Sequence, residues 1–193
     1  ADPIVFMYMG GFIIALAIEK WNLHRRIAMT IISMMGSSSN HVILGTMIAT
    51  AFISMWISNA ATALMMLPIA LALIEEIKTA KFLSPESAHK FSKALLLTVA
   101  YSASIGGLAT LIGSVPNAVF AAVAASSLDR SVSFAQWMLF ALPITIILLI
   151  VLYLLLTKWL FKIDDADQVS SDFAKKELHN LGPMSYEEKL TGL

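Results

Sequence analysis

Cysteine is absent from the sequence, so neither a disulfide framework nor a thiolate metal site is available. Charged side chains make up only 13% of the residues, whereas a soluble domain carries about a quarter. Basic and acidic residues number 13 each, and this balance gives no indication of a nucleic-acid partner. The histidines are His24, His41, His89 and His179. They lack a metal-ligand spacing such as HExxH, so we expect loop or interfacial roles for them.

Apolar residues are abundant: 58% of the 193 residues are hydrophobic, and the mean hydropathy is +0.78. This composition predicts an integral membrane protein. The opening "ADPIVFMYMGGF" contains neither an initiator Met nor the basic region of a signal peptide. Together with the polar ending "LGPMSYEEKLTGL", it leads us to expect an internal piece of a longer protein.

Residues 1–35 are expected to form a partial transmembrane helix followed by an interfacial helix. The apolar run Ile4–Ile18 is shorter than the roughly 20 residues that a full crossing needs. The following "EKWNLHRRIA" is basic and amphipathic, which is typical of a helix at a membrane surface. The cluster Gly36–Asn40, "GSSSN", then breaks the chain and offers an N-cap for the next helix.

Residues 41–75 form an apolar stretch that is too long for one ordinary span and too short for two. One reading is a single long tilted helix. The other is a re-entrant hairpin whose tip is Ser58-Asn59, in the middle of "SMWISNAATALMMLPIA". Such a tip is tolerated at membrane depth only where it is buried in protein or faces water. Pro68 is compatible with both readings.

Residues 94–127 are also uncharged, and they predict a broken transmembrane helix. Three glycines and a proline disfavour a continuous helix there: Gly106, Gly107, Gly113 and Pro116. We expect helical parts from Lys93 to about Ile105 and from Asn117 to about Ser127, joined by an unwound loop.

The remaining segments are simpler. Residues 75–93 are predicted to be a polar loop, and residues 134–161 a transmembrane helix with Trp137 and Trp159 as interfacial anchors. Residues 162–193 are predicted to be a polar cytoplasmic linker, partly helical at best, that leads to a missing second half.

Basic residues predict the orientation in the membrane. Lysines gather after Ile74 and again after Thr157, whereas the turn around Arg130 holds one cation. We therefore place the lysine-rich loop and tail in the cytoplasm. In this arrangement the hairpin enters from the cytoplasmic side and returns to it, so the charge distribution favours the hairpin over the tilted helix.

Each uncharged stretch has one polar interruption near its middle, and paired broken helices indicate the binding site of a secondary transporter. Ser54, Ser58 and Asn59 offer the hydroxyl and amide oxygens that suit sodium. The glycines of "SIGGLAT" allow backbone carbonyls to turn inward. An anion would be held by hydroxyls, amides and helix N-termini. The other interpretation is that these residues only pack and bond to neighbouring helices.

At these residues the sequence resembles the divalent anion:sodium symporters, which are carriers of dicarboxylates, citrate and sulfate. That family has a Ser-Asn-Thr motif at a hairpin tip and a Gly-Gly-x-x-Thr…Gly-x-x-Pro-Asn loop between half-helices. "ISNAATALMMLPIA" is similar to the first motif. The second is matched by Gly106, Gly107, Thr110, Gly113, Pro116 and Asn117. The flanks "GGFIIALAIEKWNLHRRIA" and "LGPMSYEEK" are also similar, so the resemblance covers essentially the whole chain.

The resemblance implies an all-α integral membrane protein of the inner or plasma membrane, of which this chain is one inverted-repeat half. It implies a sodium ion at Ser54, Ser58, Asn59 and the backbone near Gly107, and substrate contacts from Ser58, Asn59 and Thr110. It also implies a homodimer that works by an elevator-like movement, with no covalent chemistry and no catalytic residue.

Two residues depart from the family pattern. Ala60 stands where the family usually has Thr, which removes a hydroxyl contact, and Val115 stands where Pro or Gly is common. We expect the full-length parent to carry out sodium-coupled transport of small di- or tricarboxylates, or of sulfate. The alternatives are an arsenite-pump-like or other ion transporter, and a non-transporting membrane fragment. We expect no transport by this chain alone, because the second half of the site is missing.

Overall fold

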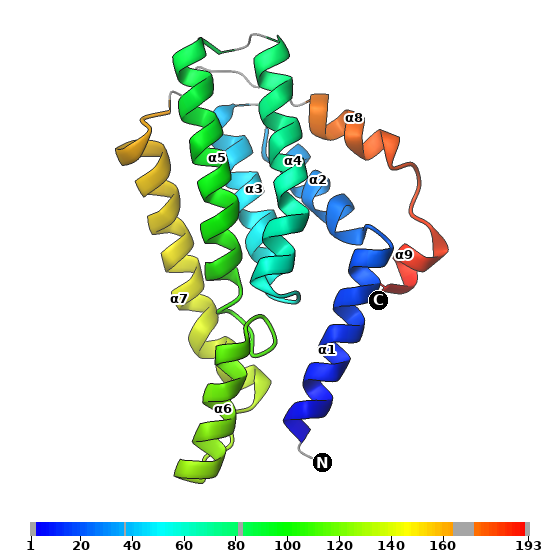
Figure 1. The fold of residues 1–193 in the computed structure, drawn as a ribbon, viewed down its shortest axis with the longest axis vertical. Coiled ribbons are helices and arrows are strands. Elements are labelled where there is room, and N and C mark those ends of the chain that lie inside the picture. Colours follow the sequence, from blue (N-terminus) through cyan, green and yellow to red (C-terminus); the bar gives the residue numbers. More distant parts are fainter. Residues whose placement is uncertain (1–2, 37, 81–82, 164–171, 192–193) are drawn as a thin grey trace.

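The computed structural model describes residues 3–36, 38–80, 83–163 and 172–191, and every regular element within these ranges is helical (Figure 1). The elements are α1 (Pro3–Lys20), α2 (Leu23–Met35), α3 (Ser39–Ser54), α4 (Asn59–Ala80), α5 (Pro85–Gly106), α6 (Val115–Leu128), α7 (Phe134–Leu154), the π-helix η1 (Leu155–Leu160), α8 (Asp172–Asn180) and α9 (Tyr186–Thr191). Helices α3, α4, α5 and α7 run along the long axis of the molecule, and α2 packs against α3 (Figure 1). The all-helical fold expected from the sequence is confirmed at this level.

Residues 41–75 fold as two helices joined by a turn, so the reading of one long helix is wrong. Helix α3 begins after Ser38, whose Oγ accepts a hydrogen bond from the His41 backbone N–H at 3.4 Å. Helix α3 ends at Ser54, residues 55–58 form the turn, and α4 begins at Asn59. The polar interruption therefore lies where the chain reverses.

The second apolar stretch also breaks, between α5 and α6. Helix α5 ends at Gly106, and α6 begins at Val115 with Pro116 in its first turn, where a missing N–H costs nothing. Residues 107–114 between them are turns and bends.

The polar loop predicted over residues 75–93 is wrong. Helix α4 continues to Ala80, and α5 already begins at Pro85, behind the N-cap Ser84, whose Oγ accepts from the Ser87 N–H at 3.2 Å. The charged residues of this region are Glu and Lys, which have a high helix propensity. Polarity there marks the ends of two helices, not an irregular connection.

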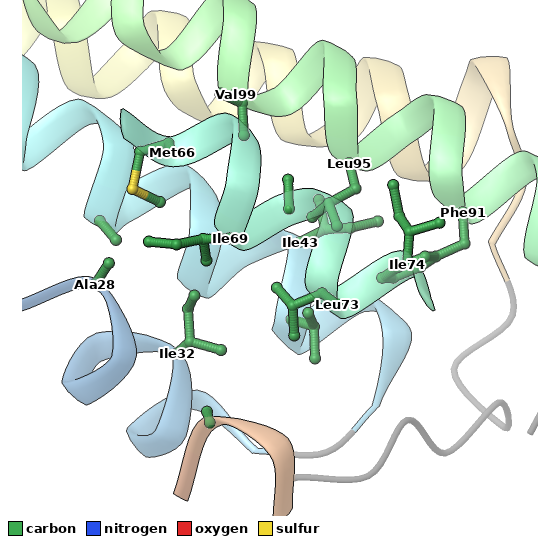
Figure 2. Close-up of a cluster of buried hydrophobic side chains, with 14 of the residues drawn as sticks. Ala28, Ile32, Ile43, Met66, Ile69, Leu73, Ile74, Phe91, Leu95 and Val99 are labelled. Carbon is green, nitrogen blue, oxygen red and sulfur yellow. The ribbon is translucent and has the colours of Figure 1, made fainter. Parts of the chain in front are cut away.

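The core lies among α2, α3, α4 and α5, and Figure 2 shows side chains from these helices pointing toward one another. Its largest fully buried side chain is Phe91, which belongs to the same buried cluster as Ile43 and Met66. Between helices in lipid, such contacts stabilise through close packing, because the surrounding acyl chains are as apolar as the core.

Two helical segments are long and apolar enough to cross a membrane, Asn59–Thr79 and Phe134–Leu160. Only 39% and 22% of their most apolar windows are buried inside the protein, so most of each surface faces outward. Helices α3 and α6 contain 16 and 14 residues, or about 24 and 21 Å, less than the roughly 30 Å hydrocarbon core.

Residues 164–171 and 192–193 of the predicted linker lie outside the described residues. The described part contains α8, which packs against α2, and α9, which packs against α1. Arg26 on α2 makes a bidentate ion pair with Glu188, with both N–O distances at 3.1 Å, and donates to the Gly182 carbonyl at 2.9 Å. The C-terminal helices are therefore tied to the helix that precedes the hairpin.

Candidate functional site

The polar turn of the hairpin meets the α5–α6 break. Ser54, at the end of α3, is fully buried, and its Oγ donates to the Ala103 carbonyl of α5 at 2.5 Å. This contact crosses from the first apolar stretch to the second. It shows that the two interruptions recognised in the sequence lie together in space.

Asn59, the first residue of α4, completes the contact. One end of its amide lies 3.0 Å from Ser54 Oγ, 3.1 Å from the Ala103 oxygen and 3.2 Å from the Gly113 oxygen. The single Ser54 hydroxyl proton is already directed at Ala103, and the two carbonyls can only accept. The amide therefore presents Nδ2 to this group and donates to it.

Gly107 makes room for that amide. A Cβ at position 107 would overlap the Asn59 side chain. A Cβ at position 113 would lie 2.6 Å from the Gly107 carbonyl oxygen and 2.9 Å from the Ser54 carbonyl oxygen. The glycines are required here by close approach, since neither has a positive φ. Gly106 is confined in the same way by the Ala51 backbone of α3.

The loop between α5 and α6 is held from inside by two polar side chains. Asn117 Nδ2 donates to the Gly107 and Thr110 carbonyls, each at 2.8 Å. Thr110 is fully buried; its Oγ1 donates to the Met55 carbonyl and accepts from the Gly113 N–H at 3.0 Å. Thr110 therefore joins the loop to the hairpin turn.

The predicted site residues occupy three different environments. Ser54, Asn59 and Gly107 come together in the buried contact, and Thr110 is buried beside it. Ser58 is exposed, and its Oγ accepts from the Ala61 N–H at 3.4 Å, as an N-terminal cap does.

Sequence reasoning missed Ala103 and Trp137. Ala103 contributes its backbone carbonyl oxygen, and because every residue has one, the residue type gives no indication of this role. Trp137, which the sequence predicts to be an interfacial anchor, also donates its Nε1–H to the Leu108 carbonyl at 2.9 Å, and its ring lies 5.7 Å from that of Phe120. Asn117 was detectable, because it belongs to the matched motif.

The contact between the hairpin turn and the α5–α6 break is lined by uncharged oxygen atoms. Ser54 Oγ and the carbonyl oxygens of Ala103 and Gly113 surround the point that the Asn59 amide nitrogen occupies. In the described residues no cluster of three His, Cys, Asp or Glu side chains exists that could hold a metal. Hydroxyl, amide and carbonyl oxygens are the set that coordinates sodium at unwound helices.

Broken apolar helices around a polar, uncharged point are typical of membrane transporters. The family model described as the sodium:sulfate symporter transmembrane region matches residues 1–192, and the chain belongs to this family of integral membrane proteins. The sodium-dependent dicarboxylate transporter SdcS of Staphylococcus saprophyticus is 42% identical over 192 residues, and that of Staphylococcus aureus is 40% identical. These alignments cover 98% of this chain but only 37% of the length of each relative.

Proposed function

We propose that the full-length protein couples the movement of sodium to the transport of a small dicarboxylate, a tricarboxylate or sulfate. The observation that carries the proposal is the meeting of Ser54, Asn59 and the Ala103 carbonyl at two helix breaks. Support also comes from the relatives, which are named sodium-dependent dicarboxylate transporters.

Sodium would bind at the point that now receives the Asn59 amide. The Asn59 side chain would first move away from this point. Ser54 Oγ and the Ala103 and Gly113 carbonyl oxygens would then be ligands, and the displaced Asn59 Oδ1 would turn toward the ion. The Gly107 carbonyl lies within the same loop and has a second lone pair beside its bond from Asn117. Ser58 would contribute its carbonyl oxygen, which already accepts from the Thr62 N–H at 2.9 Å.

The substrate anion would bind on the outer side of the turn. Ser58 and Ala60 are exposed, Asn59 is half-buried, and the first N–H groups of α4 begin here. A helix N-terminus attracts an anion without a fixed cation, and a bound sodium would add to that attraction. Thr110 would contact the substrate only after leaving the Met55 carbonyl, so in the present geometry it positions the loop.

In the membrane, α3 and α4 would form a re-entrant hairpin, and α5 with α6 a broken crossing. The lengths of α3 and α6, about 24 and 21 Å, support this, since each ends before a full crossing. The hairpin turn and the loop of residues 107–114 would then meet near the middle of the bilayer, within a protein that works as a homodimer by an elevator-like movement.

The test is uptake of labelled succinate by the full-length protein in proteoliposomes, with sodium or choline outside. We expect uptake in sodium alone and a loss of about tenfold or more in Asn59→Ala. Equal uptake in choline would refute sodium coupling and favour another ion. Full activity of Asn59→Ala at equal protein amount would refute the site.

A further inference from the structure

A cavity of about 300 Å³ lies between α2, α4 and α8, away from the hairpin turn. This volume is at the lower end of the range of ligand pockets, about 300–1,000 Å³. Its apolar wall is made by Met29 of α2 and by Met65, Pro68 and Ile69 of α4. None of these residues belongs to the candidate transport site.

The polar side of the cavity is formed by His24 and Arg25 on α2 and by Glu177 on α8, and Arg25 and Glu177 form an ion pair with each other. The Arg25 side chain is 46% exposed, so its guanidinium is accessible to a ligand. The neighbouring Arg26 is different, since it is only 11% exposed and is engaged by Glu188 and two backbone carbonyls. Arg25 is therefore the cation that this cavity offers.

Exposed charges of both signs lie close in the chain to these residues: Glu19 and Lys20 at the end of α1, and Lys175 and Lys176 on α8. Helix α2 itself is amphipathic, with an apolar side buried on the core, as interfacial helices are. A cavity with an apolar wall and a half-exposed arginine at its edge fits a molecule with an anionic head and an apolar chain.

We propose that this cavity binds an anionic phospholipid. Its phosphate pairs with Arg25 in place of Glu177, and part of an acyl chain lies along Met65 and Pro68. Basic pockets at the membrane surface bind acidic lipid headgroups in this way, because both the charge and the apolar area contribute. The lipid would contact three helices: α2, the hairpin helix α4 and the C-terminal helix α8.

The test is native mass spectrometry of the full-length protein titrated with phosphatidylglycerol, phosphatidylcholine of the same chains, or glycerol 3-phosphate. We expect phosphatidylglycerol to bind at least about fivefold more tightly than phosphatidylcholine, and glycerol 3-phosphate not to bind. Equal binding of the two lipids would overturn the proposal, and binding of glycerol 3-phosphate alone would identify a phosphate site instead.

Two substitutions with opposite expected effects separate binding from folding. Arg25→Gln should weaken phosphatidylglycerol binding about fivefold, whereas Glu177→Gln should strengthen it, because it removes the competing carboxylate. Both break the same ion pair, so a purely structural role would change binding in the same direction. Such a shared direction would refute the proposal.

Ala72→Phe, which places a ring in the cavity, should also weaken binding. Arg130→Gln removes an exposed cation far along the chain and serves as the control that should leave binding unchanged. Unchanged binding in Ala72→Phe would likewise count against the cavity. The measurement needs neither sodium nor substrate, so its failure would leave the proposed transport function intact.

Discussion

At the scale of single residues, Gly107 is the position of the candidate site that least tolerates a side chain. Its missing side chain leaves the space that the Asn59 amide fills, so Gly107→Ala must displace Asn59 or separate α4 from the loop. We expect Gly107→Ala to remove sodium-dependent uptake and to lower the free energy of unfolding by about 1–3 kcal/mol. Uptake normalised to protein amount and thermal unfolding measure these effects.

Gly10 provides the matched control for that substitution. It lies within helix α1, and a Cβ there would have no neighbour within 4 Å. Gly10→Ala should therefore leave uptake unchanged and, by removing a helix-interior glycine, add about 0.5–1 kcal/mol of stability. Equal losses in the two variants would show that Gly107 has no special place in the site.

Ala60 is the residue where this chain departs from the family motif, and it is exposed at the turn. A Thr side chain has room there, so Ala60→Thr should fold normally. If the substrate binds against this turn, the added hydroxyl should increase the apparent affinity for the dicarboxylate. The half-saturating succinate concentration measures this, and an unchanged value would place the substrate elsewhere.

His24 makes stability depend on pH. Burial lowers the pKa of His24 below its ordinary value of 6.5, although a hydrogen bond with the Ile18 carbonyl and the charge of Glu19 oppose the shift. Arg25 adds to the lowering, and Glu177 is the other charged group in the adjoining cavity. The neutral form is thus preferred in the folded state.

The sign of the pH effect follows from linkage. The unfolded chain binds the proton more readily, so the stability from neutral His24 is fully present above about pH 6.5 and declines as the pH falls below it. Thermal unfolding between about pH 7.5 and 5.5 should show this decline, and His24→Gln should reduce it. The same slope in His24→Gln would assign the effect to another group.

At the scale of elements, α9 is joined to α2 by one buried ion pair. Arg26 and Glu188 are 11% and 8% exposed, and the Arg26 hydrogen bonds lower the pKa of the Glu188 carboxyl below its usual range. Removing one partner leaves a buried charge unpaired. Arg26→Gln or Glu188→Gln should therefore destabilise the packing of α9 on α2 by about 3 kcal/mol.

Hydrogen exchange of α8 and α9 would measure this loss, with the double variant less destabilised than the sum of the two single variants. Lys90→Gln is the control, since the Lys90–Glu86 pair lies exposed on α5 and should be dispensable. Unchanged exchange in Arg26→Gln would mean that other contacts hold α9.

Element boundaries were only partly predictable. Local signals lie at both interruptions, because Ser58-Asn59 falls at the turn between α3 and α4, Gly107 directly follows α5 and Pro116 lies in the first turn of α6. The region 75–93 misled the prediction, since charged residues were taken as loop although their helix propensity carried α4 to Ala80 and began α5 at Pro85.

At the scale of the whole molecule, the proposed orientation can be tested directly, because the chain has no cysteine of its own. Single cysteines at the exposed positions His41 and Lys90 flank the hairpin, and Ser131 lies after α6. A re-entrant hairpin followed by one broken crossing predicts that His41→Cys and Lys90→Cys react with an impermeant maleimide from the same side. Ser131→Cys should react from the other side.

The measurement is labelling of sealed vesicles, before and after permeabilisation, with the full-length protein in which any cysteine outside these 193 residues has been replaced. Reaction of His41→Cys and Lys90→Cys from opposite sides would mean that the hairpin crosses the bilayer completely. Reaction of all three from one side would contradict the broken crossing.

The sequence by itself determined the membrane class, the family, and the two polar interruptions in otherwise apolar stretches. These depend on composition and on glycine, proline and capping residues, whose effects act within a few positions of the chain. Only the tertiary structure decided that Ser54 meets Ala103, that Ser58 faces outward while Thr110 is buried, and that Arg26 holds Glu188. These outcomes depend on which helix faces approach one another and on backbone carbonyls, which are present at every position and carry no signal in the sequence.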